Sequence, residues 1–159
     1  DVANLLRAGG CVVMLRHAAT VAGVGDPPGF RLDACSTQRN LSEAGQQDAR
    51  RIGEWFRASG LKPRAVLSSA WCRCKDTADL AFGAHKLWAP LNSTFIERSL
   101  QPDQSRLVRQ GMAKVPAGQF EVWVTHQVNI SALAEGSPAS GEAFVFDRQG
   151  KVLARTTFA

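Results

Sequence analysis

Two of the three histidines in this chain stand directly after apolar runs of strand length. His17 follows the run at 12–16, and His126 follows the run at 120–125. In an open α/β sheet, ligands bind in the crevice beyond the carboxyl ends of the strands, so polar residues that follow separate strands tend to converge there. We therefore expect the two imidazoles to share one crevice.

Two arginines accompany these histidines. Arg16 directly precedes His17, and Arg73 comes shortly after a third apolar run at 65–69. Any one of these residues alone is better explained as a surface or strand-end residue, because short motifs match by chance. Two guanidiniums and two imidazoles in one crevice, however, suit a tetrahedral, doubly charged group such as a phosphoryl. The four residues together predict an enzyme that handles phosphate.

Composition and charge narrow the class of protein. The chain is 45% hydrophobic and 21% charged, which is typical of a globular protein. Its length of 159 residues predicts a single domain over 1–159. No segment approaches the roughly 20 unbroken apolar residues of a membrane span. The net charge of +5 favours anionic ligands. The basic residues are scattered and lack interleaved aromatics, so nucleic-acid binding is not expected.

The four cysteines bear on the compartment. Cys11 lies inside an apolar run and is expected to be a buried free thiol, and the spacing of the others does not match a paired metal site. One disulfide among Cys35, Cys72 and Cys74 would fit an oxidising compartment, and it would tie the early loop to the Arg73 segment. The start at Asp1 fits a mature form without its leader, although trimming would leave the same start. We expect a periplasmic or secreted protein, with reduced thiols in the cytoplasm as the alternative.

Strand-length apolar runs alternate with stretches of helical period along the chain. This alternation predicts a three-layer α/β fold, with a mostly parallel central sheet flanked by helices and an antiparallel edge. A long irregular loop at 21–39 separates the first strand from the first long helix. The predicted strands are 11–15, 65–68, 86–89, 121–125 and a terminal hairpin of 143–146 with 152–157. The predicted helices are 42–60, 71–82, 105–112 and a short one after His126.

Several motifs in order resemble the histidine phosphatase superfamily, which has the phosphoglycerate-mutase-like fold. The segment 15–20, Leu-Arg-His-Ala-Ala-Thr, is similar to the Arg-His-Gly signature of that superfamily. The segment 40–45 resembles the start of its second helix, and 68–78 matches the pattern of serines before a second arginine and Thr-Ala after it. Val-Thr-His at 124–126 is similar to the second catalytic histidine at its strand end. The ordered set is far more specific than any one motif.

The resemblance implies roles for these residues. His17 would attack phosphorus through an unprotonated ring nitrogen and form a phosphohistidine that water hydrolyses. Arg16, Arg73 and His126 would surround the phosphoryl oxygens and stabilise the charge of the transition state. The two arginines also oppose protonation of His17. No metal and no cofactor is expected, because the guanidiniums neutralise the phosphoryl charge.

The proton donor for the leaving oxygen is left open by the sequence. Glu97 lies between the second arginine and the second histidine, where many members of the superfamily carry an acid. Glu142 and Asp33 are the rivals, and some short members lack an obvious acid, which suits good leaving groups such as phosphoramidates. Arg39, with Gln38 and Arg31, either extends the anion pocket or is solvated on the loop.

Two functions follow from this interpretation. The first is a metal-independent phosphatase acting on a phosphomonoester, such as a sugar or heptose phosphate, or on a phosphohistidine protein. The alternative is a catalytically weak module that binds a phosphorylated partner in the same pocket. Ala18 stands where the signature has glycine, which would disfavour a positive φ and could lower activity. The short chain leaves little room for the added segments of mutases, so hydrolysis is preferred.

Overall fold

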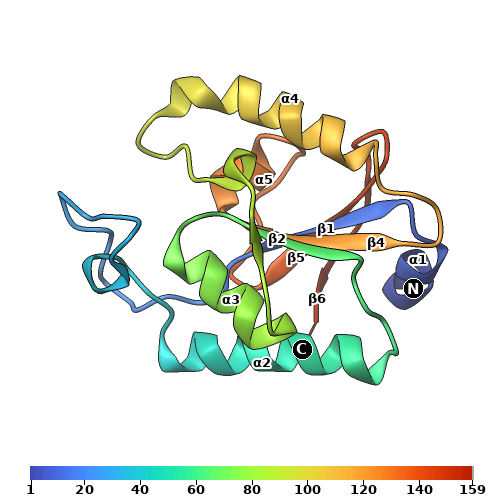
Figure 1. Cartoon of the computed structure of the whole chain (residues 1–159), viewed down its shortest axis with the longest axis horizontal. Coiled ribbons are helices and arrows are strands. Elements are labelled where there is room, and N and C mark those ends of the chain that lie inside the picture. The colour runs from blue at the N-terminus through green and yellow to red at the C-terminus, as the bar shows by residue number, and fades with distance from the viewer. Residues whose placement is uncertain (159) are drawn as a thin grey trace.

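The computed structural model describes residues 1–158, and its centre is one six-stranded sheet (Figure 1). The strands lie in the order β3-β2-β4-β1-β5-β6. β1, β2, β3 and β4 are parallel, whereas β5 is antiparallel to β1 and to β6. The mixed sheet with an antiparallel edge confirms the predicted fold class. The strand bounds are β1 Cys11–Arg16, β2 Ala65–Ser68, β3 Lys86–Leu87, β4 Phe120–Thr125, β5 Glu142–Asp147 and β6 Val152–Thr157.

Helices cover both faces of this sheet. In Figure 1, α2 and α3 lie below the sheet and α4 lies above it, with α5 between α4 and the strands. Three short 3-10 turns, η1 Cys35–Thr37, η2 Ala89–Leu91 and η3 Arg98–Leu100, lie in the connections. The helix bounds are α1 Val2–Ala8, α2 Glu43–Ala58, α3 Cys72–Phe82, α4 Gln101–Met112 and α5 Gln127–Ser131.

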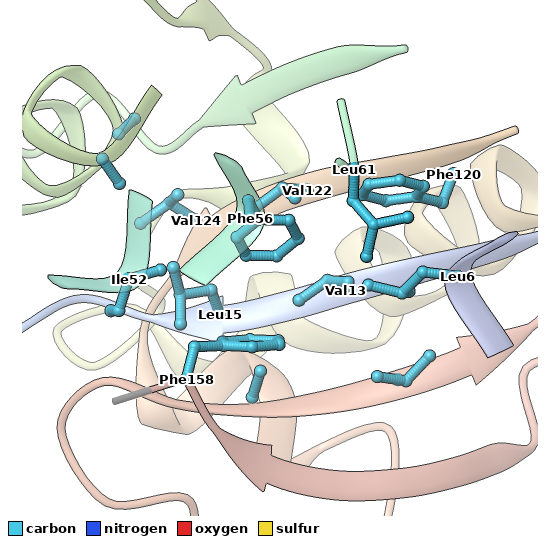
Figure 2. Close-up of a cluster of buried hydrophobic side chains, with 14 of the residues drawn as sticks. Leu6, Val13, Leu15, Ile52, Phe56, Leu61, Phe120, Val122, Val124 and Phe158 are labelled. Carbon is cyan, nitrogen blue, oxygen red and sulfur yellow. The ribbon is translucent and has the colours of Figure 1, made fainter. Parts of the chain in front are cut away.

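Each face of the sheet buries its own hydrophobic cluster. On the α2 side, Phe56 packs among side chains of β1 and β4, with Phe158 closing the cluster from the end of the chain (Figure 2). On the α4 side, Trp123 packs with Met112 and Ile130. The central strands are therefore apolar on both faces, which explains their continuous hydrophobic runs in the sequence.

The start of α2 fixes the segment that follows His17. Ser42 caps the helix by accepting a hydrogen bond from the backbone N–H of Gly45 at 3.0 Å, and the backbone N–H of Ser42 donates to Ala19 O at 3.0 Å. A Cβ on Gly45 would lie 1.9 Å from Ala19 O, so only glycine permits this approach. The backbone beyond His17 is thus packed directly on the first turn of α2.

Several element bounds differ from the sequence expectation, and those of β3 and α4 have a clear physical reason. β3 ends at Leu87 rather than at Ala89, because the 3-10 turn η2 begins at Ala89 and has Pro90 as its second residue. α4 begins at Gln101, one turn before the expected Ser105, and Pro102 occupies its first turn, where the missing N–H costs nothing.

The disulfide joins Cys35 to Cys72, which are 37 residues apart, and so ties the early loop to the first turn of α3. Cys11 and Cys74 are buried free thiols. None of the helices in residues 1–158 is long and apolar enough to cross a membrane.

Candidate active site

The carboxyl ends of neighbouring parallel strands bring the two histidines together. Arg16 and Thr125 pair in register at the ends of β1 and β4, and the backbone N–H of His17 donates to Thr125 O at 3.1 Å. The residues that follow each strand therefore share one edge of the sheet. The ring centroids of His17 and His126 lie 5.6 Å apart.

A cavity of about 940 Å³ opens at this edge. Five of its lining residues carry the predicted anion-binding groups, and we call them the anion site: Arg16, His17, Arg39, Arg73 and His126. Arg73 arrives from the first turn of α3, because β2 lies beside β4 and the chain turns directly into that helix. Arg39 arrives from the loop at 21–39. The structure thus gathers side chains from four separate segments.

His17 is held in a form suited to nucleophilic attack. Its Nδ1 lies 2.9 Å from Ala18 O, an acceptor, so Nδ1 carries the proton and Nε2 keeps its lone pair. Burial, followed by the charges of Arg73 and Arg16, lowers the pKa of His17 to about 3 against the opposing effect of that hydrogen bond. The imidazole is therefore neutral at physiological pH.

His126 is buried and contacts side chains from α3 and from the segment that leads into it. Ser69 Oγ lies 2.8 Å from Nε2, and the Cys74 sulfur lies 3.5 Å from the same nitrogen. Burial, and then the neighbouring His17 and Arg73, lowers the pKa of His126 below its ordinary value. The Trp71 ring lies edge-on to the imidazole at 5.3 Å between centroids. Trp71 also lines the cavity.

Among the residues that the structure describes, the arginines of the anion site keep hydrogen-bond donors without a protein partner. Arg16 Nη1 donates to Pro138 O at 2.9 Å, which fixes its guanidinium. Within residues 1–158, the buried Nε atoms of Arg16, Arg39 and Arg73 have no hydrogen-bond partner. Burial and the neighbouring guanidiniums lower the pKa of Arg16 and of Arg39. Like charges held this close, with donors left unpaired, are suited to an anion.

Thr77 links the segment that follows His17 to the helix that carries Arg73. Its Oγ1 accepts from the backbone N–H of Ala18 at 3.1 Å and donates to Arg73 O at 2.7 Å. This contact gives a physical reason for the Thr-Ala pair after the second arginine. Ala18 needs no left-handed backbone, because positive φ in residues 1–158 is confined to glycines. The strain expected from alanine at this position is therefore absent.

The proposed proton donors lie outside this cavity lining. The Glu97 side chain is exposed before η3, although its neighbours Phe95, Ile96 and Arg98 line the cavity. Glu142 is held by the backbone N–H of Ala139 at 2.8 Å. Asp33 is exposed and pairs with Arg31 at 3.2 Å, so neither of these loop residues extends the anion site.

Asp26 is the carboxylate that sequence reasoning missed. Both of its oxygens lie 3.1 Å from Arg73 Nη1, and Oδ1 accepts the backbone N–H of Arg39 at 2.8 Å. Burial would raise the pKa of Asp26, but the Arg39 N–H and the Arg73 charge outweigh it and hold the pKa below its ordinary value. No periodic signal in the irregular loop marks this aspartate. Only a Gly-Asp-Pro turn pattern singles it out.

Comparison with known proteins decides the family. The sequence model of the histidine phosphatase superfamily (branch 1) matches residues 12–129. The chain belongs to this superfamily. The match includes all four segments that resemble the superfamily, namely 15–20, 40–45, 68–78 and 124–126. No curated protein matches this chain significantly.

Solved structures share the fold of this member of the superfamily. A protein named as the phosphohistidine phosphatase SixA from Agrobacterium tumefaciens is 21% identical, with a TM-score of 0.60, covering 93% of this chain and 98% of its own. The protein histidine phosphatase SixA complexed with tungstate is 14% identical, with a TM-score of 0.57 and coverages of 92% and 96%. A mycobacterial glucosyl-3-phosphoglycerate phosphatase complexed with VO3 is 18% identical, with a TM-score of 0.62 and coverages of 86% and 92%.

Proposed function

We propose that this protein is a metal-independent phosphatase that works through a phosphohistidine on His17. The observation that carries the proposal is the state of that imidazole, neutral and hydrogen-bonded through Nδ1 to Ala18 O, among guanidiniums with unpaired donors. A neutral nucleophile surrounded by fixed cations is the arrangement that phosphoryl transfer requires. Two structural neighbours were crystallised with tungstate and VO3, which is consistent with an oxyanion site in this fold.

The reaction proceeds in two displacements. The Nε2 lone pair of His17 attacks phosphorus, and the bond from phosphorus to the leaving oxygen or nitrogen breaks with its electron pair. The leaving group departs as an anion and takes its proton from solvent. Water then attacks the phosphohistidine and gives a proton to solvent, inorganic phosphate is released, and the pair returns to Nε2. Arg16, Arg73 and His126 stabilise the equatorial oxygens in both steps. The guanidiniums supply the positive charge needed for this.

The cavity favours a leaving group that departs without a strong acid. Asp26 is the one carboxylate among the described lining residues, and its ion pair with Arg73 keeps it deprotonated. Three large apolar side chains, Trp71, Phe95 and Ile96, also line the cavity. Phosphoramidates such as phosphohistidine, and phosphomonoesters of acidic alcohols, therefore fit better than simple sugar phosphates. The neighbours' names include both a protein histidine phosphatase and a sugar phosphate phosphatase.

Hydrolysis of p-nitrophenyl phosphate in the presence of EDTA tests this proposal. Release of phosphate by the wild-type protein, lost in His17→Ala, is expected. The matched control is His85→Ala, because His85 pairs with Asp79 on the protein surface and does not line the cavity. Tight phosphate binding without turnover would contradict the proposal and indicate an anion-binding module instead. Activity that EDTA abolishes would contradict metal independence.

We further propose that the protein works in an oxidising compartment such as the periplasm. The Cys35–Cys72 disulfide supports this, because such bonds persist mainly outside the reducing cytoplasm. Trapping thiols in intact cells with a membrane-permeant alkylating reagent is expected to label neither Cys35 nor Cys72. Labelling of both would indicate a cytoplasmic protein.

A further inference from the structure

Asp26 and Arg73 form a buried ion pair at the edge of the anion site. Their side chains are 15% and 6% exposed, and the carboxylate lines the same cavity as the two histidines. Neither the motifs of the sequence nor the proposed reaction steps give Asp26 a role. A charge buried this far is retained only with a partner, so the pair fixes both side chains.

The geometry of the pair leaves most of the guanidinium available. Both Asp26 oxygens contact the same nitrogen, Nη1, and Arg39 O accepts from that nitrogen at 3.4 Å. Nε of Arg73 is buried and has no partner in the described part of the chain. Because a guanidinium has five donors, an anchor on Nη1 leaves the others for phosphoryl oxygens.

The loop that carries Asp26 is itself fastened to α3. The backbone N–H of Arg39 donates to Asp26 Oδ1 at 2.8 Å. Gln38 Oε1 accepts from the backbone N–H of Cys72 at 3.0 Å, and Cys72 is bonded to Cys35. The carboxylate and the arginine are thus tied together through the backbone as well as through their charges. Asp26 is therefore held in place rather than resting on Arg73 by chance.

We propose that Asp26 is a positioning residue that orients the Arg73 guanidinium for the transferring phosphoryl group. This inference rests on the proposed phosphatase function and deepens it. Oriented donors act mainly on the transition state, whereas attraction of a phosphate dianion needs only positive charge nearby. Loss of Asp26 therefore lowers turnover much more than it changes the binding of phosphate.

The test compares Asp26→Ala with the wild-type protein on an aryl and an alkyl phosphate. We expect kcat to fall about tenfold on both p-nitrophenyl phosphate and glycerol 2-phosphate, with the inhibition constant of inorganic phosphate changing less than about threefold. The kcat of Asp26→Asn is expected to lie between those of the wild-type protein and Asp26→Ala, because its Oδ1 still accepts from the Arg39 N–H and from Arg73. The matched control is Asp103→Ala, an exposed carboxylate on α4 paired with Arg106.

A double mutant isolates the action through Arg73. Arg73→Lys keeps the positive charge and loses the planar fork, so adding Asp26→Ala to it is expected to lower kcat less than about threefold further. A full additional tenfold loss would overturn the proposal. Thermal unfolding shows whether Asp26→Ala folds, and if it does not, Asp26→Asn decides by the same measurements.

Other outcomes would assign Asp26 differently. A loss confined to glycerol 2-phosphate would make Asp26 the proton donor, and a rise in both kcat and phosphate affinity would make it an internal competitor of the substrate. Unchanged kinetics would also overturn the inference. Each of these results requires an active wild-type protein that His17→Ala inactivates, so failure of the positioning role is distinguishable from failure of the phosphatase function.

Discussion

The chemistry of the cavity depends on how each of its titratable residues is held. His17 is neutral because it is buried among arginines, and its Nδ1–H is used by Ala18 O. Asp26 is charged because Arg73 and the Arg39 backbone stabilise the carboxylate. A neutral base beside a charged carboxylate provides a nucleophile but leaves no protein acid in the described cavity lining.

The missing acid predicts a strong dependence on the leaving group. We expect kcat/KM to fall steeply along a series of phosphate esters as the pKa of the leaving alcohol rises, because no side chain protonates the departing oxygen. Steady-state kinetics on substituted phenyl phosphates and on glycerol 2-phosphate measures the slope. A flat series whose first step is shown to limit the rate would contradict this prediction and indicate an acid that the present cavity does not hold.

Residues that follow strands could be located from the sequence, and residues on the loop could not. Arg16 ends the first apolar run, and His17 and His126 come directly after apolar runs, so the sheet itself determines that they meet. Asp26 lies in a loop without periodicity, and its position depends on contacts with Arg39 and Arg73 that are remote in sequence. Glu97 is near the cavity in sequence terms, but the chain turns at η3 and leaves its side chain in solvent.

At the scale of elements, the site depends on how loop 21–39 and helix α2 are fastened to the strands. Most elements were predictable because their apolar period is strong, as in α2, whose Ser42 cap and closing turn were both visible in the sequence. The partner of Cys35 was not predictable, because Cys72 and Cys74 are two residues apart. The structure resolves this, since Cys74 points into the core and lies against His126.

The disulfide is expected to stabilise both the fold and the loop. Replacing Cys35 and Cys72 by serine should lower the free energy of unfolding by about 3–4 kcal/mol, from the entropy of a loop closed over 37 residues. Urea unfolding of the two proteins measures this difference. The variant should also lose activity, because the loop carries Asp26 and Arg39. Equal stability of the oxidised protein and the serine variant would contradict this expectation. As a control, reductant should not change the stability of the serine variant.

Gly45 is expected to be essential for the packing of α2 on the His17 segment. Gly45→Ala should cost about 1–3 kcal/mol of stability, because its Cβ would collide with Ala19 O. The same change should lower kcat by moving the backbone two residues after His17. Gln47→Ala, at an exposed position of the same helix, is the control for helix propensity. A Gly45→Ala protein as stable and as active as the wild type would show that this contact is not needed.

At the scale of the whole molecule, burial of the site couples its chemistry to the stability of the fold. The fold class and the superfamily are established, whereas the single domain over 1–159 stays a prediction. The anion site lies at the ends of the central strands, and its two histidines, His17 and His126, are buried there. Unfolding therefore exposes both imidazoles to water and restores their ordinary pKa.

Stability is expected to fall as the pH drops below about 6.5. The pKa of His17 is about 3 in the folded state and about 6.5 in the unfolded state, so between these values only the unfolded chain binds the proton. The free energy of unfolding should therefore fall by about 1.4 kcal/mol per pH unit from this group. Urea unfolding from pH 7 to pH 5 measures the slope. In His17→Asn the slope of stability against pH should be smaller by the contribution of one proton, about 1.4 kcal/mol per pH unit. Equal slopes in the two proteins would contradict a buried neutral imidazole.

Trapping of the phosphorylated enzyme shows directly whether His17 is the nucleophile. The wild-type protein is mixed with p-nitrophenyl phosphate, quenched in alkali within milliseconds, digested and analysed by mass spectrometry. We expect a phosphoryl group on His17 that is stable in alkali and lost in acid. It should be missing from His17→Asn. A phosphoryl group on another residue, or an active enzyme that never carries one under conditions where the second step is rate-limiting, would contradict the account.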